Sequence, residues 1–318
     1  MKTKISCLLM ILILFCLTPV SQLAQDPIEK KKIVSLAMPY TLRVHAIALS
    51  DIRGGRAVAI TPEQVKQWVD KANELFKLSG AGIQLAFSTN KLLNNFEVMK
   101  NTALNNLASD GTGWKEANEI AAQHPHKIVY FFRWGPGSSA TGNGFSFPPE
   151  MGCNFVALPG FNNTSVTSNG EVSVQNIWQL AHDTGHFLGL PHTFPGWSGV
   201  DTNDWDDKKN VALATETADY IAKQGGSAKA LDGDGIFDTP AEAGASYYIH
   251  RGWKLCTEHD SYTISGKKSD GTPFSVTFKP ARNNVMSYFA CEPMRFTAGQ
   301  VNRMRTTLQS PARNQLLQ

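Results

Sequence analysis

The segment QLAHDTGHFLGLPHTF, residues 179–194, decides the fold, because it sets three histidines around the end of one helix. Residues four apart on an α-helix lie on the same face, about one turn from each other. His182 and His186 can therefore direct imidazole nitrogens at a single ion. A third ligand cannot come from the same turn, so the chain has to reverse before it reaches His192.

The sequence supplies that reversal. Gly189 can adopt the left-handed conformation that ends a helix, and Pro191 prevents the helix from resuming, so His192 can return to the ion. Three neutral histidines leave a fourth tetrahedral position for water, which is typical of a catalytic rather than a structural zinc site. The spacing therefore predicts a zinc ion held by three histidines. The alternative interpretation is a set of surface histidines on an amphipathic helix.

Residues 182–192, HDTGHFLGLPH, resemble the zinc signature of the metzincin metalloproteases, His-Glu-x-x-His-x-x-Gly-x-x-His. NNVMSYFAC, residues 283–291, resembles the methionine turn of these enzymes. Within the clan the chain is most similar to the pappalysin-type metalloproteases. The features that carry this likeness are PHTF after the zinc helix, GDGIFDTP further along, and a tyrosine two residues after the turn methionine, followed by FTAGQVNRM. The resemblance covers roughly residues 40–310.

The resemblance implies an α+β, metzincin-like fold. A twisted mixed sheet with packed helices would form an N-terminal subdomain, residues 40–190, and residues 191–318 would form a loop-rich C-terminal subdomain. Zinc would lie at the floor of a shallow cleft between them. Peptide or protein substrates would bind extended against an edge strand from about residues 144–158. The implied activity is that of a zinc-dependent endopeptidase.

The resemblance also assigns roles to single residues. Asp183 occupies the position of the general base, and Tyr288 that of a tyrosine that helps to stabilise the oxyanion. Met286 is the turn methionine and supports the site by packing. The zinc ligands are His182, His186 and His192.

Asp183 departs from the family pattern, which has glutamate there. A general base must lie within ~2.6–3.2 Å of the proton that it abstracts. Aspartate is one methylene shorter, and a misplacement of about 1 Å can cost on the order of a hundredfold in rate. The alternatives are a slow protease, a zinc-binding pseudopeptidase that binds peptides or proteins, a deliberately silenced enzyme, or a non-protease zinc hydrolase. Thr184 is a second departure, because an apolar residue is expected there.

The rest of the chain alternates strands and helices up to the zinc helix. Thr61 with Gln64, and Thr297 with Gln300, form capping boxes that mark the start of two helices. We expect strands at residues 40–49, 82–88, 127–134 and 153–160, and helices at residues 61–80, 114–124, 172–189 and 297–309.

The N-terminal residues have the pattern of a secretory signal peptide: Lys2 and Lys4 precede an apolar run that is too short for the ~20 residues of a membrane span. We expect cleavage after residue 24, a lead over residues 25–39, and a catalytic domain over residues 40–318. An uncleaved anchor is the alternative. Cleavage would lower the formal net charge from +3 to +1. The mature chain is expected to be secreted, in a periplasmic or extracellular space, without stable membrane insertion.

Three cysteines remain after that cleavage, and an odd number in an exported chain suggests one disulfide and one thiol. We expect Cys256 to pair with Cys291, because the two flank a segment that resembles part of the active site. Cys153 would be a buried thiol, or a partner if that pairing is wrong.

Asp232, Asp234 and Asp238 offer oxygen atoms around glycines, and members of the family bind structural calcium in this half of the chain. A calcium site is one interpretation of these residues, and a solvated Asp/Gly turn is the other. No basic stripe dense enough for nucleic acid is present in the sequence. The sequence does not indicate an oligomeric state.

Overall fold

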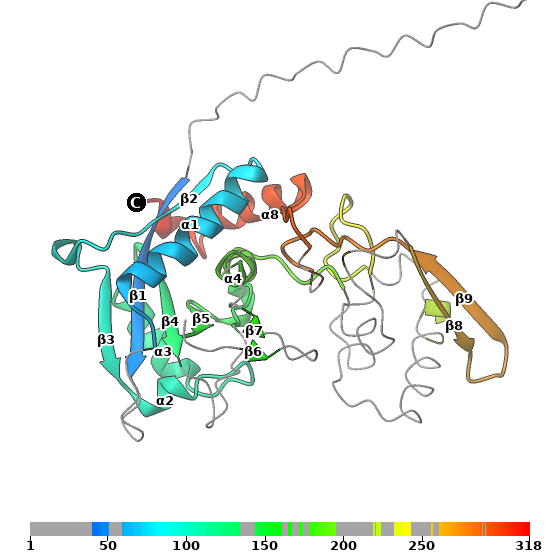
Figure 1. Cartoon of the computed structure of the whole chain (residues 1–318), viewed down its shortest axis with the longest axis horizontal. Coiled ribbons are helices and arrows are strands. Elements are labelled where there is room, and N and C mark those ends of the chain that lie inside the picture. The colour runs from blue at the N-terminus through cyan, green and yellow to red at the C-terminus, as the bar shows by residue number, and fades with distance from the viewer. Residues whose placement is uncertain are drawn as a thin grey trace, which may run out of the picture. The chain divides into compact units, whose positions relative to one another are not determined.

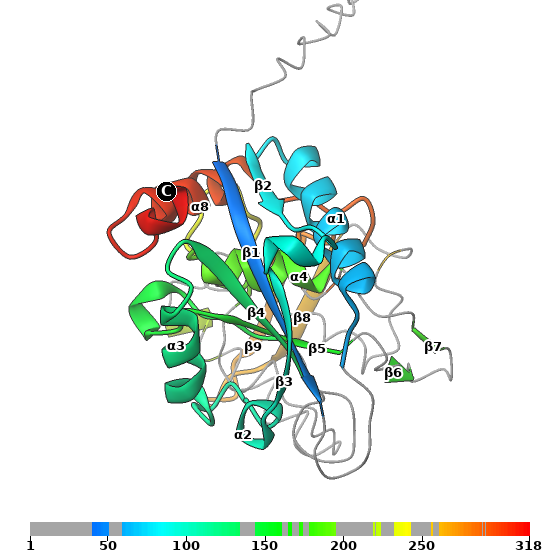
Figure 2. The same cartoon turned by 90° about the vertical axis from the view of Figure 1, so that its left-hand side faces the viewer.

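The computed structural model shows a parallel sheet with helices on both faces (Figures 1 and 2). The sheet has the order β2-β1-β4-β5, and β3 pairs with the second half of β1. All these pairs are parallel. The strands are β1 (Tyr40–Ser50), β2 (Ile83–Ala86), β3 (Phe96–Lys100), β4 (Lys127–Arg133) and β5 (Val156–Pro159). The structure describes residues 40–50, 59–133, 144–160, 165–166, 172–173, 178–194, 219, 221–223, 232–242, 256, 261–287, 289 and 291–318.

One antiparallel bridge extends the sheet past β5. The backbone N–H of Phe145 donates to the carbonyl of Ala157 at 2.8 Å, and the N–H of Ala157 donates back at 2.9 Å. The five named strands are all parallel, and this isolated bridge adds one antiparallel pair at their edge. It also falls within the segment expected to provide an edge, residues 144–158.

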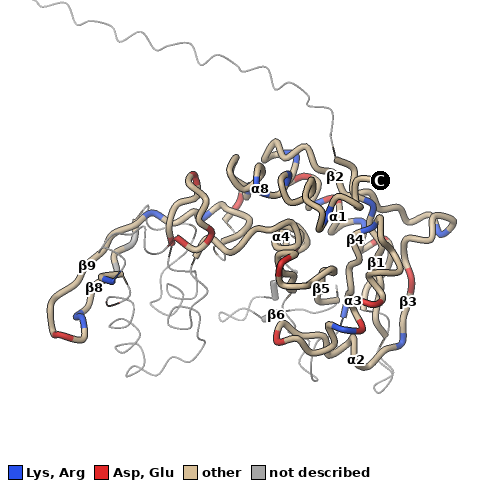
Figure 3. Tube along the Cα trace, turned by 180° about the vertical axis from the view of Figure 1, so that it is seen from behind, with Lys and Arg blue, Asp and Glu red and all other residues tan. Residues whose placement is uncertain are grey.

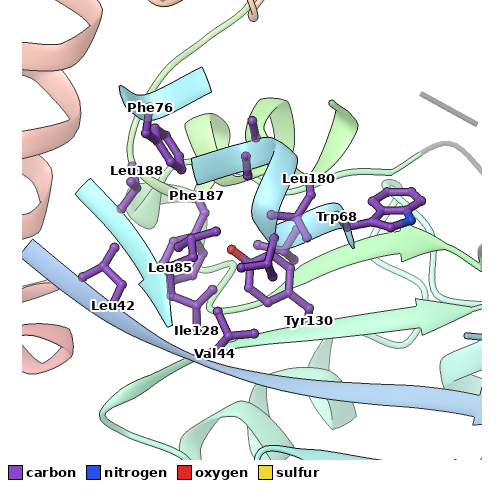
Figure 4. Packing of buried hydrophobic residues seen from close by; sticks show 14 of the residues in the cluster. Leu42, Val44, Trp68, Phe76, Leu85, Ile128, Tyr130, Leu180, Phe187 and Leu188 are labelled. Atoms are coloured by element: carbon purple, nitrogen blue, oxygen red, sulfur yellow. The ribbon is translucent and has the colours of Figure 1, made fainter. Parts of the chain in front are cut away.

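The apolar residues of β4 alternate between two cores. Ile128, Tyr130 and Phe132 face α1 (Pro62–Leu78) and α4 (Gln179–Phe187). Val129 and Phe131 face α2 (Thr102–Asn105) and α3 (Trp114–Ala122). A strand buried on both faces has to be apolar throughout, which explains its near-continuous hydrophobic run. Figure 4 shows Tyr130 among the labelled side chains of the first core.

Both predicted capping boxes are present. The side chain of Thr61 accepts from the backbone of Gln64, and that of Thr297 from the backbone of Gln300. They open α1 and α8 (Ala298–Gln309). Short 3-10 turns complete the described elements: η1 (Lys91–Leu93), η2 (Pro149–Met151) and η4 (Asn314–Leu317).

The prediction of a helix over residues 172–189 is wrong at its start. The helix α4 begins at Gln179, and residues 172–173 form strand β7 (Val172–Ser173) instead. This strand pairs with β6 (Ser165–Val166) in an antiparallel hairpin. The two-residue pairing to an upstream segment overrides the helical periodicity of this stretch.

A second hairpin, β8 (Tyr262–Lys267) with β9 (Pro273–Phe278), lies in the part of the chain expected to be loop-rich. Its connection includes Gly271 at φ +83°, and the N–H of Lys268 donates to the carbonyl of Thr272 at 2.9 Å. Before this hairpin, Cys256 forms the expected disulfide with Cys291, and Cys153 is a buried free thiol.

Residues 36–318 form one compact unit by their contacts, and residues 1–35 lie outside the described residues. The signal peptide and the boundary between subdomains at residue 190 therefore stay predictions. None of the helices that the structure describes has the length and apolar content needed to cross a bilayer.

The helix α4 is anchored to the sheet by a buried hydrogen bond. The hydroxyl of Tyr130 on β4 lies 2.8 Å from Oγ1 of Thr184, and Thr184 also donates to the carbonyl of Leu180 at 2.5 Å. Tyr130 and Thr184 are both fully buried. Thr184, where the resemblance led us to expect an apolar residue, therefore has a hydrogen-bond partner that an apolar residue would lack.

We expect Thr184→Val to lower the free energy of unfolding by about 1–3 kcal/mol, because it leaves the buried Tyr130 hydroxyl without its partner. Chemical denaturation of the wild type and the variant measures this loss. The double variant Tyr130→Phe/Thr184→Val removes both polar groups and should regain part of the stability. A double variant whose loss equals the sum of the two single losses would contradict the coupling.

Candidate metal centre

Three histidine nitrogens converge at the end of α4. The Nε2 atoms of His182 and His186 lie 3.1 Å apart, those of His186 and His192 also 3.1 Å, and those of His182 and His192 3.2 Å. The sequence predicted this group, and it is one of two clusters among the described residues with donor atoms close enough to hold a metal.

The tautomers of two of these rings follow from their other nitrogen. Nδ1 of His182 lies 2.7 Å from the carbonyl oxygen of Val285, and Nδ1 of His186 lies 2.6 Å from that of Leu190. A carbonyl oxygen only accepts, so each Nδ1 carries the proton and donates. Nε2 of each ring is then left with a lone pair that points into the cluster. Such lone pairs repel one another unless a cation lies between them.

The spacing fits zinc. Atoms 3.1–3.2 Å apart lie about 1.8 Å from the centre of their triangle, which is less than the ~2.0–2.1 Å of a zinc–nitrogen bond. The three nitrogens are therefore close enough together to be the ligands of one zinc ion.

Burial keeps the imidazoles in the form that binds metals. Burial, together with the nearby His186, lowers the pKa of His182 to about 3, and burial lowers the pKa of His186 to about 4. Burial, followed by the two neighbouring rings, also holds the pKa of His192 well below its usual value. All three rings are therefore neutral over the physiological range, as metal ligands must be.

The reversal that brings in His192 follows the predicted geometry. Gly189 has φ +88°, its N–H donates to His186 O at 2.9 Å, and the N–H of Leu190 donates to Gly185 O at 2.9 Å. These two bonds form the Schellman motif that closes a helix at a left-handed glycine. The ring of His192 then stacks on Phe194 with centroids 4.7 Å apart.

The predicted turn methionine lies directly beneath α4. A Cβ atom on Gly185 would lie 2.6 Å from Sδ of Met286, so glycine at this position lets the thioether pack closely against α4. Met286 is fully buried. Tyr288, the predicted oxyanion residue, lies outside the described residues.

Asp183 is the single acidic residue of α4, marked red in Figure 3, and it is 1% exposed. Its Oδ2 atom has no hydrogen-bond partner in the part of the chain that the structure describes. Burial raises the pKa of Asp183 well above its usual value, and the positive charge of Arg133 at the end of β4 acts in the opposite direction.

The three aspartates of the predicted calcium site do not form a metal-holding group among the described residues. Asp232 accepts from the backbone of Gly235 at 2.8 Å, and Asp234 accepts from that of Ile236 at 2.8 Å, which is typical of Asp/Gly turns. Asp238 accepts from Thr297 Oγ1 and from the backbone N–H of Gly299, both at 2.8 Å, at the start of α8.

The second cluster with metal-ligand chemistry is His45, Glu97 and His124. Here the two imidazole rings are stacked, with centroids 3.8 Å apart and planes at 21°. Lone pairs lie in the plane of a ring, so stacked rings direct them side by side rather than to one point. By contrast, the rings of His182 and His186 meet at 89°. We therefore assign the metal to the cluster on α4.

The comparisons with known proteins agree with this site. The family model described as Pregnancy-associated plasma protein-A, a peptidase family, matches residues 120–309, more than half of the chain. The chain belongs to the pappalysin family of metalloproteases. No curated protein matches it significantly in sequence.

Two solved structures of mirolysin are similar to the chain. Mature mirolysin of Tannerella forsythia in complex with a cleaved peptide is 14% identical, with a TM-score of 0.49 over 87% of this chain and 95% of that one. Mirolysin in complex with compound 9 is 14% identical, with a TM-score of 0.50 over 87% of this chain and 96% of that one. At this identity the second likeness shows the shared metzincin fold alone.

One buried acid of this pappalysin, Glu242, was not predicted from the sequence. Glu242 is 0% exposed, and it accepts a hydrogen bond from Oγ1 of Thr193, the neighbour of His192. The backbone N–H of Thr193 also donates to Met286 O at 3.4 Å. Glu242 thus helps to hold the chain after the third histidine next to the methionine turn.

The sequence signals for such residues are weak. Glu242 is a lone acid among small residues, AEAGA, which equally describes a surface turn. Arg133 carries a clearer signal, because it ends the buried run KIVYFFR with a charge. A charge at the end of a buried strand needs a partner, and in this chain Asp183 is close enough to interact with it.

Burial raises the pKa of Glu242 from 4.5 to about 7. An unfolded chain releases this proton near its ordinary pKa, whereas the folded chain keeps it up to about pH 7. We therefore expect the stability of the wild type, relative to Glu242→Gln, to be greatest below pH 4.5 and to fall as pH rises to 7. The fall should be on the order of 3 kcal/mol.

Denaturant unfolding of both proteins across that pH range measures the difference, and pH effects that the two share cancel. Glu119→Gln, at a glutamate whose side chain is 63% exposed, is the control for a change of charge alone. A wild-type advantage that does not change with pH would contradict the raised pKa.

Proposed function

We propose that this metalloprotease is a zinc endopeptidase in which Asp183 is the general base and limits the rate. The zinc assignment is supported by the convergence of three histidine Nε2 atoms, which lie 3.1–3.2 Å apart. In two of these histidines a backbone carbonyl group fixes the tautomer. Membership of a peptidase family supports peptides or proteins as substrates.

When bound, zinc polarises a carbonyl oxygen and lowers the pKa of its water to about 7. His182, His186 and His192 would hold the ion, and the carbonyls of Val285 and Leu190 keep two of these rings in orientation. Asp183 would take the proton of the attacking water on a carboxylate oxygen and return it to the leaving amine nitrogen. Tyr288 would stabilise the oxyanion. The antiparallel edge at Phe145 would bind the extended substrate.

The short side chain of Asp183 supports a second candidate, a pseudopeptidase that binds zinc and peptides without turnover. The two functions share the metal and differ only in whether the carboxylate contacts the water. Export to a periplasmic or extracellular space is part of the proposal and rests on the N-terminal sequence.

We expect the wild type to bind about one zinc ion per chain and to cleave a denatured protein substrate, because the three imidazoles form one site. A chelator should abolish cleavage, and added zinc should restore it. His186→Ala should lose both zinc and activity. His124→Ala, at a stacked and partly exposed histidine, is the matched control and should keep both. Zinc content is measured by elemental analysis, and turnover by the appearance of new amino groups.

Asp183→Asn tests the general base. Asparagine has the same shape and cannot take the proton, so we expect normal zinc content and a loss of activity of about 10²–10⁴-fold. Equal activity of Asp183→Asn and the wild type would refute Asp183 as the base. A zinc-loaded wild type that binds peptides without cleaving them would favour the pseudopeptidase.

The calcium site stays a prediction. If Asp232, Asp234 and Asp238 bind calcium, micromolar to millimolar calcium should raise the melting temperature of the wild type. Asp232→Asn should remove that increase. No change of melting temperature with calcium would leave these aspartates with the turn and capping roles that the hydrogen bonds show.

A further inference from the structure

Asp183 contacts an edge residue that has no side chain. A Cβ atom added to Gly144 would lie 2.0 Å from Oδ2 of Asp183, 2.9 Å from Nε2 of Gln179 and 3.1 Å from Cγ of Asp183. Real Cβ atoms do not approach other atoms to 2.0 Å, so the carboxylate occupies the space that any side chain at position 144 would need. The contact therefore requires glycine for steric reasons.

The edge segment cannot easily withdraw from this contact. Phe145, the next residue, makes two backbone hydrogen bonds to Ala157 of β5, at 2.8 and 2.9 Å. Phe145 is 7% exposed, and its ring packs with those of Trp114 and Phe155, with centroids 6.3 and 6.0 Å away. The hydrogen bonds and packing of Phe145 thus hold the backbone of Gly144 in place. A side chain added at position 144 would therefore displace the carboxylate of Asp183.

The helix on the other side is equally fixed. His182 and Thr184, the two neighbours of Asp183, are hydrogen-bonded to Val285 O at 2.7 Å and to the Tyr130 hydroxyl at 2.8 Å. Asp183 is 1% exposed, and its Oδ2 has no hydrogen-bond partner among the described residues. The backbone at Gly144 therefore confines the carboxylate sterically, without a hydrogen bond to Oδ2.

We propose that Gly144 is a positioning residue for the general base. Because Gly144 has no side chain, the carboxylate of Asp183 fits into the space beside its backbone and is held there. The proposal rests on the proposed function, because it assigns a catalytic consequence to the contact. It adds that the short side chain of Asp183 and the missing side chain of Gly144 fit each other sterically. Aspartate, rather than glutamate, is then the residue that matches the space beside Gly144.

The contact between Asp183 and Gly144 predicts the effect of the substitution Asp183→Glu. The space next to Oδ2 is already filled by the backbone at Gly144, so the additional methylene of Asp183→Glu has to displace the edge or turn the carboxylate away. We expect Asp183→Glu to have a lower kcat than the wild type and unchanged zinc content. A glutamate variant that is more active than the wild type would overturn the proposal.

Gly144→Ala is the direct test. The added methyl group should displace the carboxylate by about 1 Å or more, which lowers kcat by about a hundredfold. KM should stay within about threefold, and zinc content should be unchanged, because the histidines are not touched. A kcat within twofold of the wild type would overturn the proposal. A merely structural role for Gly144 would lower the folded fraction and the zinc content together instead of kcat alone.

A double-variant cycle separates this proposal from the proposed function. Asp183→Ala removes the carboxylate, so Gly144→Ala should lower the melting temperature by several degrees in the wild type and by much less in the Asp183→Ala background. Equal losses in both backgrounds would overturn the pairing of Gly144 with Asp183, even if Gly144→Ala is too unstable for kinetics. An inactive wild type with intact coupling would contradict the proposed function alone and support the fit of the two residues.

Discussion

The site depends on two hydrogen bonds in which histidine Nδ1 donates to a backbone carbonyl. Val285 and Leu190 accept these bonds at 2.7 and 2.6 Å. Each bond orients a ring and leaves the lone pair on Nε2, 3.1–3.2 Å from the other two Nε2 atoms. Without a cation these lone pairs repel one another, and the repulsion destabilises the folded chain. The fold therefore holds the ligands in position for a metal at a cost in stability. Metal binding offsets that cost and stabilises the folded chain.

These bonds explain why the helix that carries the ligands has to be buried. Both acceptors lie outside regular secondary structure, one beside the methionine turn and the other just past Gly189, so α4 must pack between the sheet and the C-terminal segments. Arg313 secures its end from the C-terminal side. Its guanidinium donates to Phe187 O at 3.2 Å and to Cys153 O at 2.7 Å, and it lies 3.8 Å from the centre of the Phe187 ring. The same contact ties α4 to the segment just before β5, where the substrate edge is expected.

The sequence predicted the parts of this structure that depend on local spacing. Three histidines around a glycine, and two capping boxes at Thr61 and Thr297, depend on residues a few positions apart. The hairpin β8–β9, which the sequence did not lead us to expect, also has a local signal in Asp270-Gly271 between strand-forming residues. The start of α4 could not be predicted, because residues 172–173 form a strand through their pairing with residues 165–166, and this pairing has no local sequence signal. Glu242 and Gly144 lie beyond prediction for the same reason, since their significance comes entirely from contacts with distant segments.

Asp183 and Thr184 are the two adjacent positions where the resemblance led us to expect other residues, and each contacts a specific neighbour in the structure. The hydroxyl of Thr184 lies 2.8 Å from that of Tyr130, in a core where an unpaired tyrosine hydroxyl would be costly. The carboxylate of Asp183 fills the space beside Gly144 that a side chain would occupy. The aspartate is therefore part of the architecture of this metal centre, and its chemistry has to be judged together with the edge that surrounds it.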